Sequence, residues 1–175
     1  QEVFDEIARV AKTLGCATHI DGARIFNASI ATGVDVARMC EHYDSVSICF
    51  SKGLGAPVGS VLVGSSAFIA KAHRWRKMFG GGWRQAGMLA SACLYALDHH
   101  VERMSEDHER ARRIAKMLNE LPMFTVDLET VQTNMIYAQT AEPAAKVVEQ
   151  YAANGIDMFD FSEHRLRVVV HLHIT

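Results

Sequence analysis

The sequence lacks an excess of charge of either sign, which argues against a polyanionic partner. Its 18 Lys and Arg residues are balanced by 20 Asp and Glu residues, and the formal net charge is −2 at pH 7. A nucleic-acid-binding protein needs a basic surface that displaces counterions from the phosphate backbone. We therefore expect no nucleic acid among the partners.

Closely spaced cysteines are missing as well. The four cysteines, Cys16, Cys40, Cys49 and Cys93, contain no C-x-x-C pair, the spacing that zinc sites and redox dithiols commonly use. They are also too dilute for a disulfide scaffold. We expect reduced, mostly buried thiols and no metal site.

Long apolar runs are absent too. No stretch reaches the length of about 18 residues that a membrane-spanning helix requires. The first residues, from Gln1 to Glu6, contain no initiator Met, basic region or cleavage site of a signal peptide. We expect a cytoplasmic protein without a membrane partner, and a sequence that begins inside a helix of a longer chain.

Apolar residues make up 49% of the sequence, enough for a sizeable core. In the first part, short apolar runs alternate with segments of helical periodicity, which predicts an α/β fold with a largely parallel sheet covered on both faces. The expected strands are 16–20, 45–50 and 60–64, and the expected helices are 2–14, which Gly15 caps, 35–42 and 66–79.

A long helical stretch runs from Arg84 to Pro122 and is expected to cross between two domains, which we place at residues 1–95 and 96–175. The second domain is predicted to be small and of the α+β class. Its expected strands are 124–126, 135–138, 156–159 and 166–174, and its expected helix is 143–153.

Polar residues follow two successive apolar strands. Asp21 ends the first and Lys52 follows the second. Ligands of open α/β sheets bind beyond the carboxyl ends of the strands, so both side chains are expected there. An amine that forms a Schiff base and a carboxylate that keeps a ring nitrogen protonated are the pair that pyridoxal phosphate (PLP) requires. Burial of the strand and the charge of Arg24 are expected to activate the amine.

Each residue also has a simpler interpretation. A Lys after a strand is usually a solvated surface charge, and Asp21-Gly22 can be just a turn. The glycines that follow Lys52 favour a ligand site, because they let the backbone approach a ligand closely. The pattern alone leaves both interpretations open.

Three segments carry a resemblance to a known family. They are HIDGARIFNA from His19, SKGLGAPVGS from Ser51 and GGGWRQAG from Gly80. Together they resemble the threonine aldolase family, and the similarity runs from about residue 3 to the end. The resemblance implies part of a fold-type-I PLP enzyme, with a mainly parallel sheet in the large domain. It also implies a homotetramer that cleaves L-threonine or L-allo-threonine to glycine and acetaldehyde, and thus a role in threonine breakdown and glycine formation.

The resemblance also implies roles for individual residues. Lys52 would hold the cofactor covalently, Asp21 would pair with its pyridine nitrogen, and Arg24 would lie near its phenolic oxygen. The stacking His and the phosphate-binding loop of the family would belong to a front half that lies outside this sequence.

A late strand carries the expected substrate site. Arg165, Arg167 and His171 share one face of the strand by its period of two, so spacing alone cannot choose between the arginines. The family match indicates Arg167 as the group that binds the substrate carboxylate. His171 is expected to be structural. Arg84 could approach the phosphate or the substrate, or could simply pair with a neighbour.

Two alternatives stay open at this level. The same scaffold supports other PLP reactions, such as β-elimination or transamination, because fold does not fix chemistry. The chain could also be a truncated, non-catalytic fragment that keeps the motifs. The base that removes the β-hydroxyl proton cannot be named from this sequence.

Overall fold

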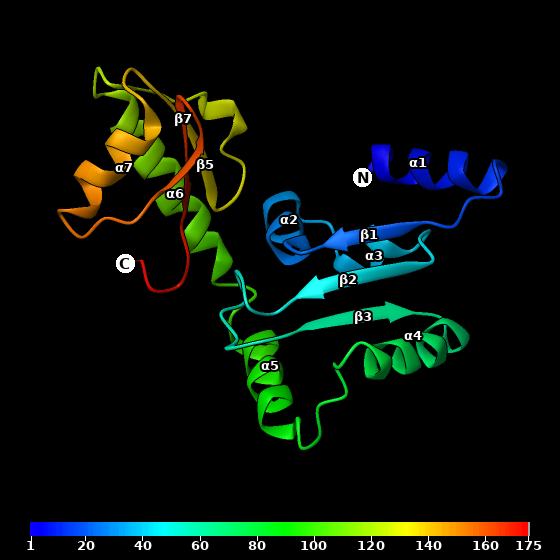
Figure 1. Ribbon diagram of the computed structural model, residues 1–175. Helices are drawn as coiled ribbons and strands as arrows, with labels where there is room; N and C mark the ends of the chain where they lie inside the picture. The colour runs from blue at the N-terminus through cyan, green and yellow to red at the C-terminus, as the bar shows by residue number, and fades with distance from the viewer. Residues whose placement is uncertain (175) are drawn as a thin grey trace. The chain divides into compact units, whose positions relative to one another are not determined.

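The computed structural model describes residues 1–174, and these form two compact units. The first unit is Gln1–Glu102 and the second begins at Arg103 (Figure 1). The domain boundary expected after residue 95 lies inside helix α5 (Gly87–His99). The division falls between Glu102 and Arg103, within the short segment that separates α5 from the next helix.

The first unit is built on a three-stranded sheet in the order β1-β2-β3, formed by His19–Gly22, Ser45–Cys49 and Ser60–Gly64. Strands β1 and β2 are parallel, whereas β3 runs antiparallel to β2, as the arrows in Figure 1 show. The described part of the sheet therefore combines one parallel and one antiparallel pair. Only the loop 50–59 joins β2 to β3, and a parallel connection needs a crossover of about a dozen or more residues.

Four further helices belong to this unit: α1 (Glu2–Thr13), α2 (Ile25–Thr32), α3 (Val36–Cys40) and α4 (Ser66–Met78). Their ends follow local chemistry. The carboxylate of Asp35 accepts the backbone N–H of Ala37 at 2.7 Å, which caps α3. Gly15 adopts φ +66° after α1, as a glycine C-cap does. Helix α2 is not among the helices that the sequence predicts; it directly follows the motif around Asp21.

The core of the first unit lies between β1–β2 and helices α2 and α3. Ile20 and Val46 from the strands pack with Ile25 and Met39 from the helices. All residues of β3 are exposed, and Val63 keeps 47% of its surface accessible. Within residues 1–174 no described element buries β3, so cover on both faces is not seen there.

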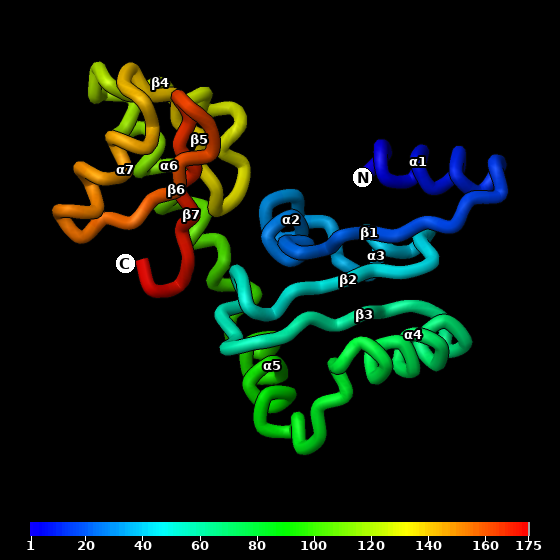
Figure 2. The backbone as a smooth tube through the Cα atoms, in the orientation of Figure 1, coloured from blue at the N-terminus to red at the C-terminus, as the bar shows by residue number. Residues whose placement is uncertain are grey.

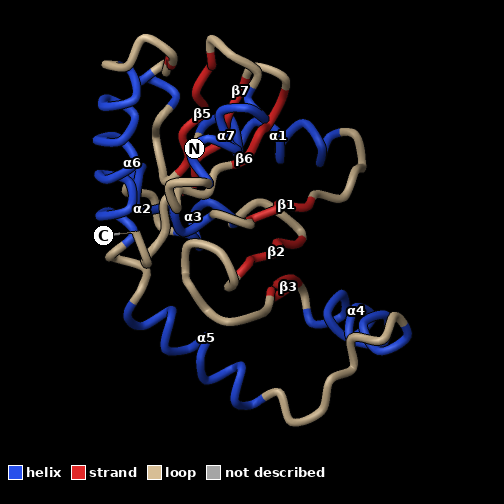
Figure 3. The backbone as a smooth tube through the Cα atoms, turned by 60° about the vertical axis from the view of Figure 1, so that its left-hand side comes forward, coloured by secondary structure: helices blue, strands red, loops and turns tan. Residues whose placement is uncertain are grey.

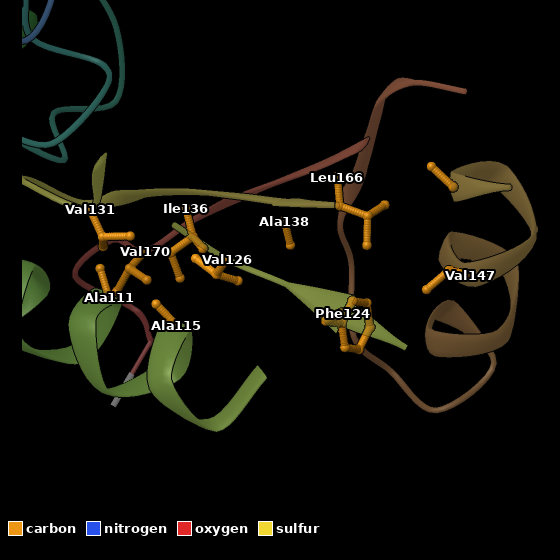
Figure 4. Packing of buried hydrophobic residues seen from close by; sticks show 11 residues of the cluster. Ala111, Ala115, Phe124, Val126, Val131, Ile136, Ala138, Val147, Leu166 and Val170 are labelled. Carbon is orange, nitrogen blue, oxygen red and sulfur yellow. The ribbon is translucent and has the colours of Figure 1, made fainter. Parts of the chain in front are cut away.

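The second unit is a four-stranded antiparallel sheet with helices on one face. Its sheet order is β4-β5-β7-β6. Ile136 and Leu166 of the sheet pack with Ala111 of α6 and Val147 of α7 in a contiguous core (Figure 4). The elements are α6 (Met104–Asn119), β4 (Phe124–Thr125), the 3₁₀ turn η1 (Leu128–Thr130), β5 (Met135–Thr140), α7 (Ala144–Ala152), β6 (Phe159–Ser162) and β7 (Arg165–Val169).

The helical stretch that the sequence predicts from Arg84 to Pro122 is two helices. It breaks between His100 and Arg103, although this segment contains neither Gly nor Pro. The side chain of His100 instead bonds the carbonyl of Leu54, and Met104 is buried at the start of α6. The break between the two helices therefore coincides with tertiary contacts and not with a helix-breaking residue.

The thiols are less buried than expected. All four are free, Cys16 is exposed, and Cys40, Cys49 and Cys93 are half-buried. Cys16 lies in the turn after α1, outside the core, so the expectation of mostly buried thiols is wrong. Among residues 1–174, no helix is long and apolar enough to cross a membrane.

Candidate active site

The carboxyl ends of β1 and β2 lie side by side at one edge of the first unit's sheet (Figure 2). Asp21 pairs in register with Ser47, and Gly22 pairs with Ile48. Asp21 therefore lies near the end of β1, and the loop that carries Lys52 leaves the end of β2. The structure places both residues at the edge that the strand pattern predicts.

Gly22 permits the close approach of the two strands beside Asp21. A Cβ atom added at Gly22 would lie 2.7 Å from the carbonyl oxygen of Ser47 and 3.1 Å from Cγ1 of Val46. The first contact is with backbone of the neighbouring strand, which cannot rotate away. This position therefore requires glycine for packing, and the turn alone does not explain it.

Asp21 and Arg24 line one cavity. The Asp21 carboxylate is exposed and accepts the backbone N–H of Ala23 at 3.2 Å. The cavity measures about 330 Å³, and the rest of its lining is mostly apolar, with Phe4 and Ile25 among the apolar residues and Gln1 and Thr32 as the polar ones. Lys52 is not one of its lining residues. The carboxylate of Asp21 and the cation of Arg24 thus border the same cavity. The position of the Lys52 amine is set by the loop that carries it.

Lys52 lies in the loop 50–59 between β2 and β3, and Figure 3 draws this loop in tan. The backbone N–H of Gly55 donates to the carbonyl of Lys52 at 2.9 Å, and Gly55 takes φ +68°. Leu54 is buried, whereas the side chain of Lys52 is exposed. The expectation that strand burial desolvates this amine is wrong within the described chain, because Lys52 lies beyond the end of the strand.

Arg84 lies in the exposed segment between α4 and α5. Within residues 1–174 it makes no hydrogen bond or ion pair, so the expected alternative of pairing with a neighbour is not observed there. The next residue, Gln85, has φ +54°, a left-handed conformation that is uncommon for a residue with a side chain. The sequence contained no signal for this backbone conformation.

In the second unit, Arg165 and Arg167 each lie over an aromatic ring. The Cζ atom of Arg167 is 5.3 Å from the ring centre of Phe159, its partner across β6 and β7. The Cζ atom of Arg165 is 5.0 Å from the ring centre of Tyr137. The Nε atom of Arg167 is buried without a hydrogen-bond partner. Its Nη edge makes no hydrogen bond or ion pair to residues 1–174, so these donors are available to an anion.

His171 does not share the strand face of the arginines. β7 ends at Val169, and Nδ1 of His171 accepts the backbone N–H of His173 at 3.4 Å. The strand argument that grouped His171 with the arginines is therefore wrong. Among the described residues, no three His, Cys, Asp or Glu side chains gather into a possible metal site.

The family follows from a comparison with known sequences. The family model described as beta-eliminating lyase matches residues 1–141. The chain belongs to the beta-eliminating lyase family. Enzymes of this family generally depend on PLP.

Curated relatives confirm the resemblance to threonine aldolases. The chain is 44% identical over 181 residues to low-specificity L-threonine aldolase 1 of Arabidopsis thaliana, which covers 99% of this chain and 50% of that protein. It is 40% identical over 175 residues to the low specificity L-threonine aldolase of Escherichia coli K12, covering 100% of this chain and 51% of that protein. The chain spans about half the length of the curated relatives it matches.

Solved structures confirm the fold class. A Listeria monocytogenes EGD-E protein assigned as an L-allo-threonine aldolase superposes with a TM-score of 0.84 at 22% identity, covering 97% of this chain and 50% of that one. A protein from Exiguobacterium sp. 255-15 is assigned as an aromatic amino acid beta-eliminating lyase/threonine aldolase. It superposes with a TM-score of 0.82 at 27% identity, and the match covers 96% of this chain and 50% of that one. The chain is thus a fragment of the fold-type-I α/β architecture.

The residues at the sheet edge fit PLP chemically. A carboxylate lies near the end of one parallel strand, a primary amine lies beyond the end of its neighbour, and a guanidinium shares a cavity with the carboxylate. The phosphate-binding groups are not identified among residues 1–174. The described residues therefore match the ring end of the cofactor.

Proposed function

We propose that this chain contributes to a PLP-dependent lyase that cleaves the Cα–Cβ bond of L-threonine or L-allo-threonine, releasing glycine and acetaldehyde. The observation that carries the proposal is the placement of Asp21 and Lys52 at the ends of the parallel strands β1 and β2. The identity to low-specificity L-threonine aldolases over almost the whole chain supports the choice of reaction.

Three residues of the first unit would hold the cofactor. The amine of Lys52 would attach it covalently, and the carboxylate of Asp21 would hold the proton at its pyridine nitrogen. The cation of Arg24 would lie near its phenolic oxygen. When bound, the cofactor supplies an electron sink for the negative charge that bond cleavage leaves at Cα.

Arg167 of the second unit would bind the substrate carboxylate. A guanidinium donates two parallel N–H bonds to a carboxylate, which fixes the orientation of the substrate as well as its position. The free Nη edge of Arg167 and the ring of Phe159 beneath its guanidinium support this role. Arg84, exposed and without a partner among residues 1–174, would contribute to binding substrate or phosphate.

Three properties stay predictions. A homotetramer and a role in threonine breakdown and glycine formation rest on the resemblance alone. A cytoplasmic location rests on the sequence alone.

Lys52→Ala in the full-length protein tests the proposal. We expect this variant to lose the visible absorbance of lysine-bound PLP while its circular dichroism is unchanged, because Lys52 is exposed and contributes little packing. Lys71→Ala, which removes an exposed amine of α4, is the matched control and should keep the absorbance. Retention of the band in Lys52→Ala would remove Lys52 from its role.

The products test the reaction. Unaltered enzyme incubated with threonine should release acetaldehyde and glycine in equal amounts. Ammonia or a keto acid in place of acetaldehyde would instead establish β-elimination or transamination as the activity.

A further inference from the structure

We propose that His100 is a positioning residue that holds the turn carrying Lys52. Its Nδ1 atom lies 2.6 Å from the carbonyl oxygen of Leu54, two residues beyond Lys52. A carbonyl oxygen can only accept, so Nδ1 is the donor and carries the hydrogen. The inference relies on the proposed function only for the chemical role of Lys52.

Helix α5 holds the loop between β2 and β3 at two points. His100 caps the end of α5 and bonds Leu54, while the thiol of Cys93 donates to the carbonyl of Val58 at 3.6 Å. Cys93 and His100 lie about two helical turns apart and therefore on the same side of the helix. Ala96, between them, is buried. One side of α5 thus supports the loop.

The loop is also held by burial of Phe50, Leu54 and Ala56, and by a hydrogen bond from the N–H of Phe50 to the carbonyl of Gly59 at 2.9 Å. Within it, the N–H of Gly55 bonds the carbonyl of Lys52 at 2.9 Å, and the N–H of Ala56 bonds the carbonyl of Phe50 at 3.0 Å. Both bonds are internal to the loop, so they shape the turn without attaching it to the rest of the unit. The His100–Leu54 bond attaches the turn at its own backbone, nearer to Lys52 than the bond of Cys93 to Val58, and Leu54 is buried with 1% of its surface exposed.

Loss of the imidazole would leave the buried Leu54 carbonyl without the donor that the structure shows. A buried acceptor that loses its partner costs about 1–3 kcal/mol, which corresponds to about a five- to hundredfold easier opening of the turn. The direction of Lys52 would then vary, and a nucleophile that is out of position reacts slowly. His100 acts on Lys52 only through the backbone.

Three variants of the full-length protein separate this role from general packing. His100→Leu keeps bulk and removes the donor. His100→Asn places an amide nitrogen near the position of Nδ1 and is the conservative rescue. His99→Leu is the matched control, because His99 is exposed and its contact is with the ring of Tyr95.

Hydrogen exchange of the amides of Gly55 and Ala56, measured without cofactor, is the first readout. We expect about five- to hundredfold faster exchange in His100→Leu and near-normal exchange in His100→Asn and His99→Leu. The second readout is a fall in kcat with little change in KM for His100→Leu alone. If His100→Leu does not fold, His100→Asn still tests the inference. Its amide donor should keep the exchange of Gly55 and Ala56 as slow as in the unaltered protein.

Unchanged exchange in a folded His100→Leu protein would overturn the inference. Equal acceleration in His100→Asn or in His99→Leu would also overturn it, because the effect would then not depend on a donor at this position. If Lys52→Ala kept the visible cofactor band while His100→Leu still freed the turn, the proposed function would fail and the positioning role would stand.

Discussion

Replacing Gly22 by Ala should disturb the sheet at the point where the candidate site is built. The added Cβ would lie 2.7 Å from the carbonyl oxygen of Ser47 and 3.4 Å from Cβ of Ile25. Relief requires β1 and β2 to separate by a few tenths of an ångström, because the nearest atom is backbone. The hydrogen bonds of the parallel pair lengthen as a result, and Asp21 moves away from the loop of Lys52.

Overpacking of this kind costs about 1–3 kcal/mol of unfolding free energy. The assay is urea denaturation of the full-length protein, followed by circular dichroism, with the visible cofactor absorbance recorded on the same samples. Gly87→Ala is the control, since a Cβ there meets nothing within 4 Å and the residue begins helix α5. That variant should be neutral or slightly stabilised.

The reasoning would be refuted if Gly22→Ala unfolded at the same urea concentration as the unaltered protein. It would also be refuted if Gly87→Ala lost as much stability as Gly22→Ala. A loss of stability at Gly22 with normal cofactor absorbance would show a narrower error: the strands would separate without moving the residues that hold the cofactor.

Asp21→Ala should still bind some cofactor but lose most of kcat, because a neutral pyridine is a poor electron sink, and near-normal turnover would contradict the role of Asp21. Arg167→Lys should raise KM about ten- to a hundredfold, since an ammonium cannot replace a bidentate fork, whereas Arg165→Lys should be mild. The reverse order in steady-state kinetics would assign the carboxylate to Arg165. The hydrogen bond from Arg38 lowers the pKa of Asp5 from 3.8 to about 2, so this contribution to stability is present above pH 3.8 and lost as pH falls through about 2. As the pH is lowered from 3.8 to about 2, the urea midpoint of Asp5→Asn should therefore fall less steeply than that of the unaltered protein.

The sequence predicts those parts of the fold that local chemistry determines. The amphipathic pattern of residues 2–14 with Gly15 corresponds closely to α1 and its left-handed cap. Apolar runs followed by polar residues place Asp21 and Lys52 at strand ends, because the run ends where the strand leaves the core. This is why the candidate site can be found before the fold is known.

Features that depend on contacts between distant segments escape the sequence. The direction of β3 depends on how the loop 50–59 folds back. The break between α5 and α6 coincides with the bond from His100 to Leu54, 46 positions earlier. The ring of Phe159 lies beneath Arg167 only because β6 and β7 pair in that register, although the alternation of aromatic residues in β6 could have suggested such a face.

Unequal burial in the two cores has a consequence for how the 175-residue chain by itself opens locally. In the second unit, Ile136 and Val147 are fully buried, whereas in the first Ile20 and Met39 each keep 8% of their surface exposed. Segments with sparse apolar burial open at lower free energy than tightly packed ones. For the 175-residue chain by itself, native-state proteolysis should therefore cut first within the first unit, which carries the residues proposed to bind the cofactor. A cofactor that binds only the folded form of this unit stabilises it by mass action. Removal of the cofactor should therefore raise the rate of proteolysis in the first unit.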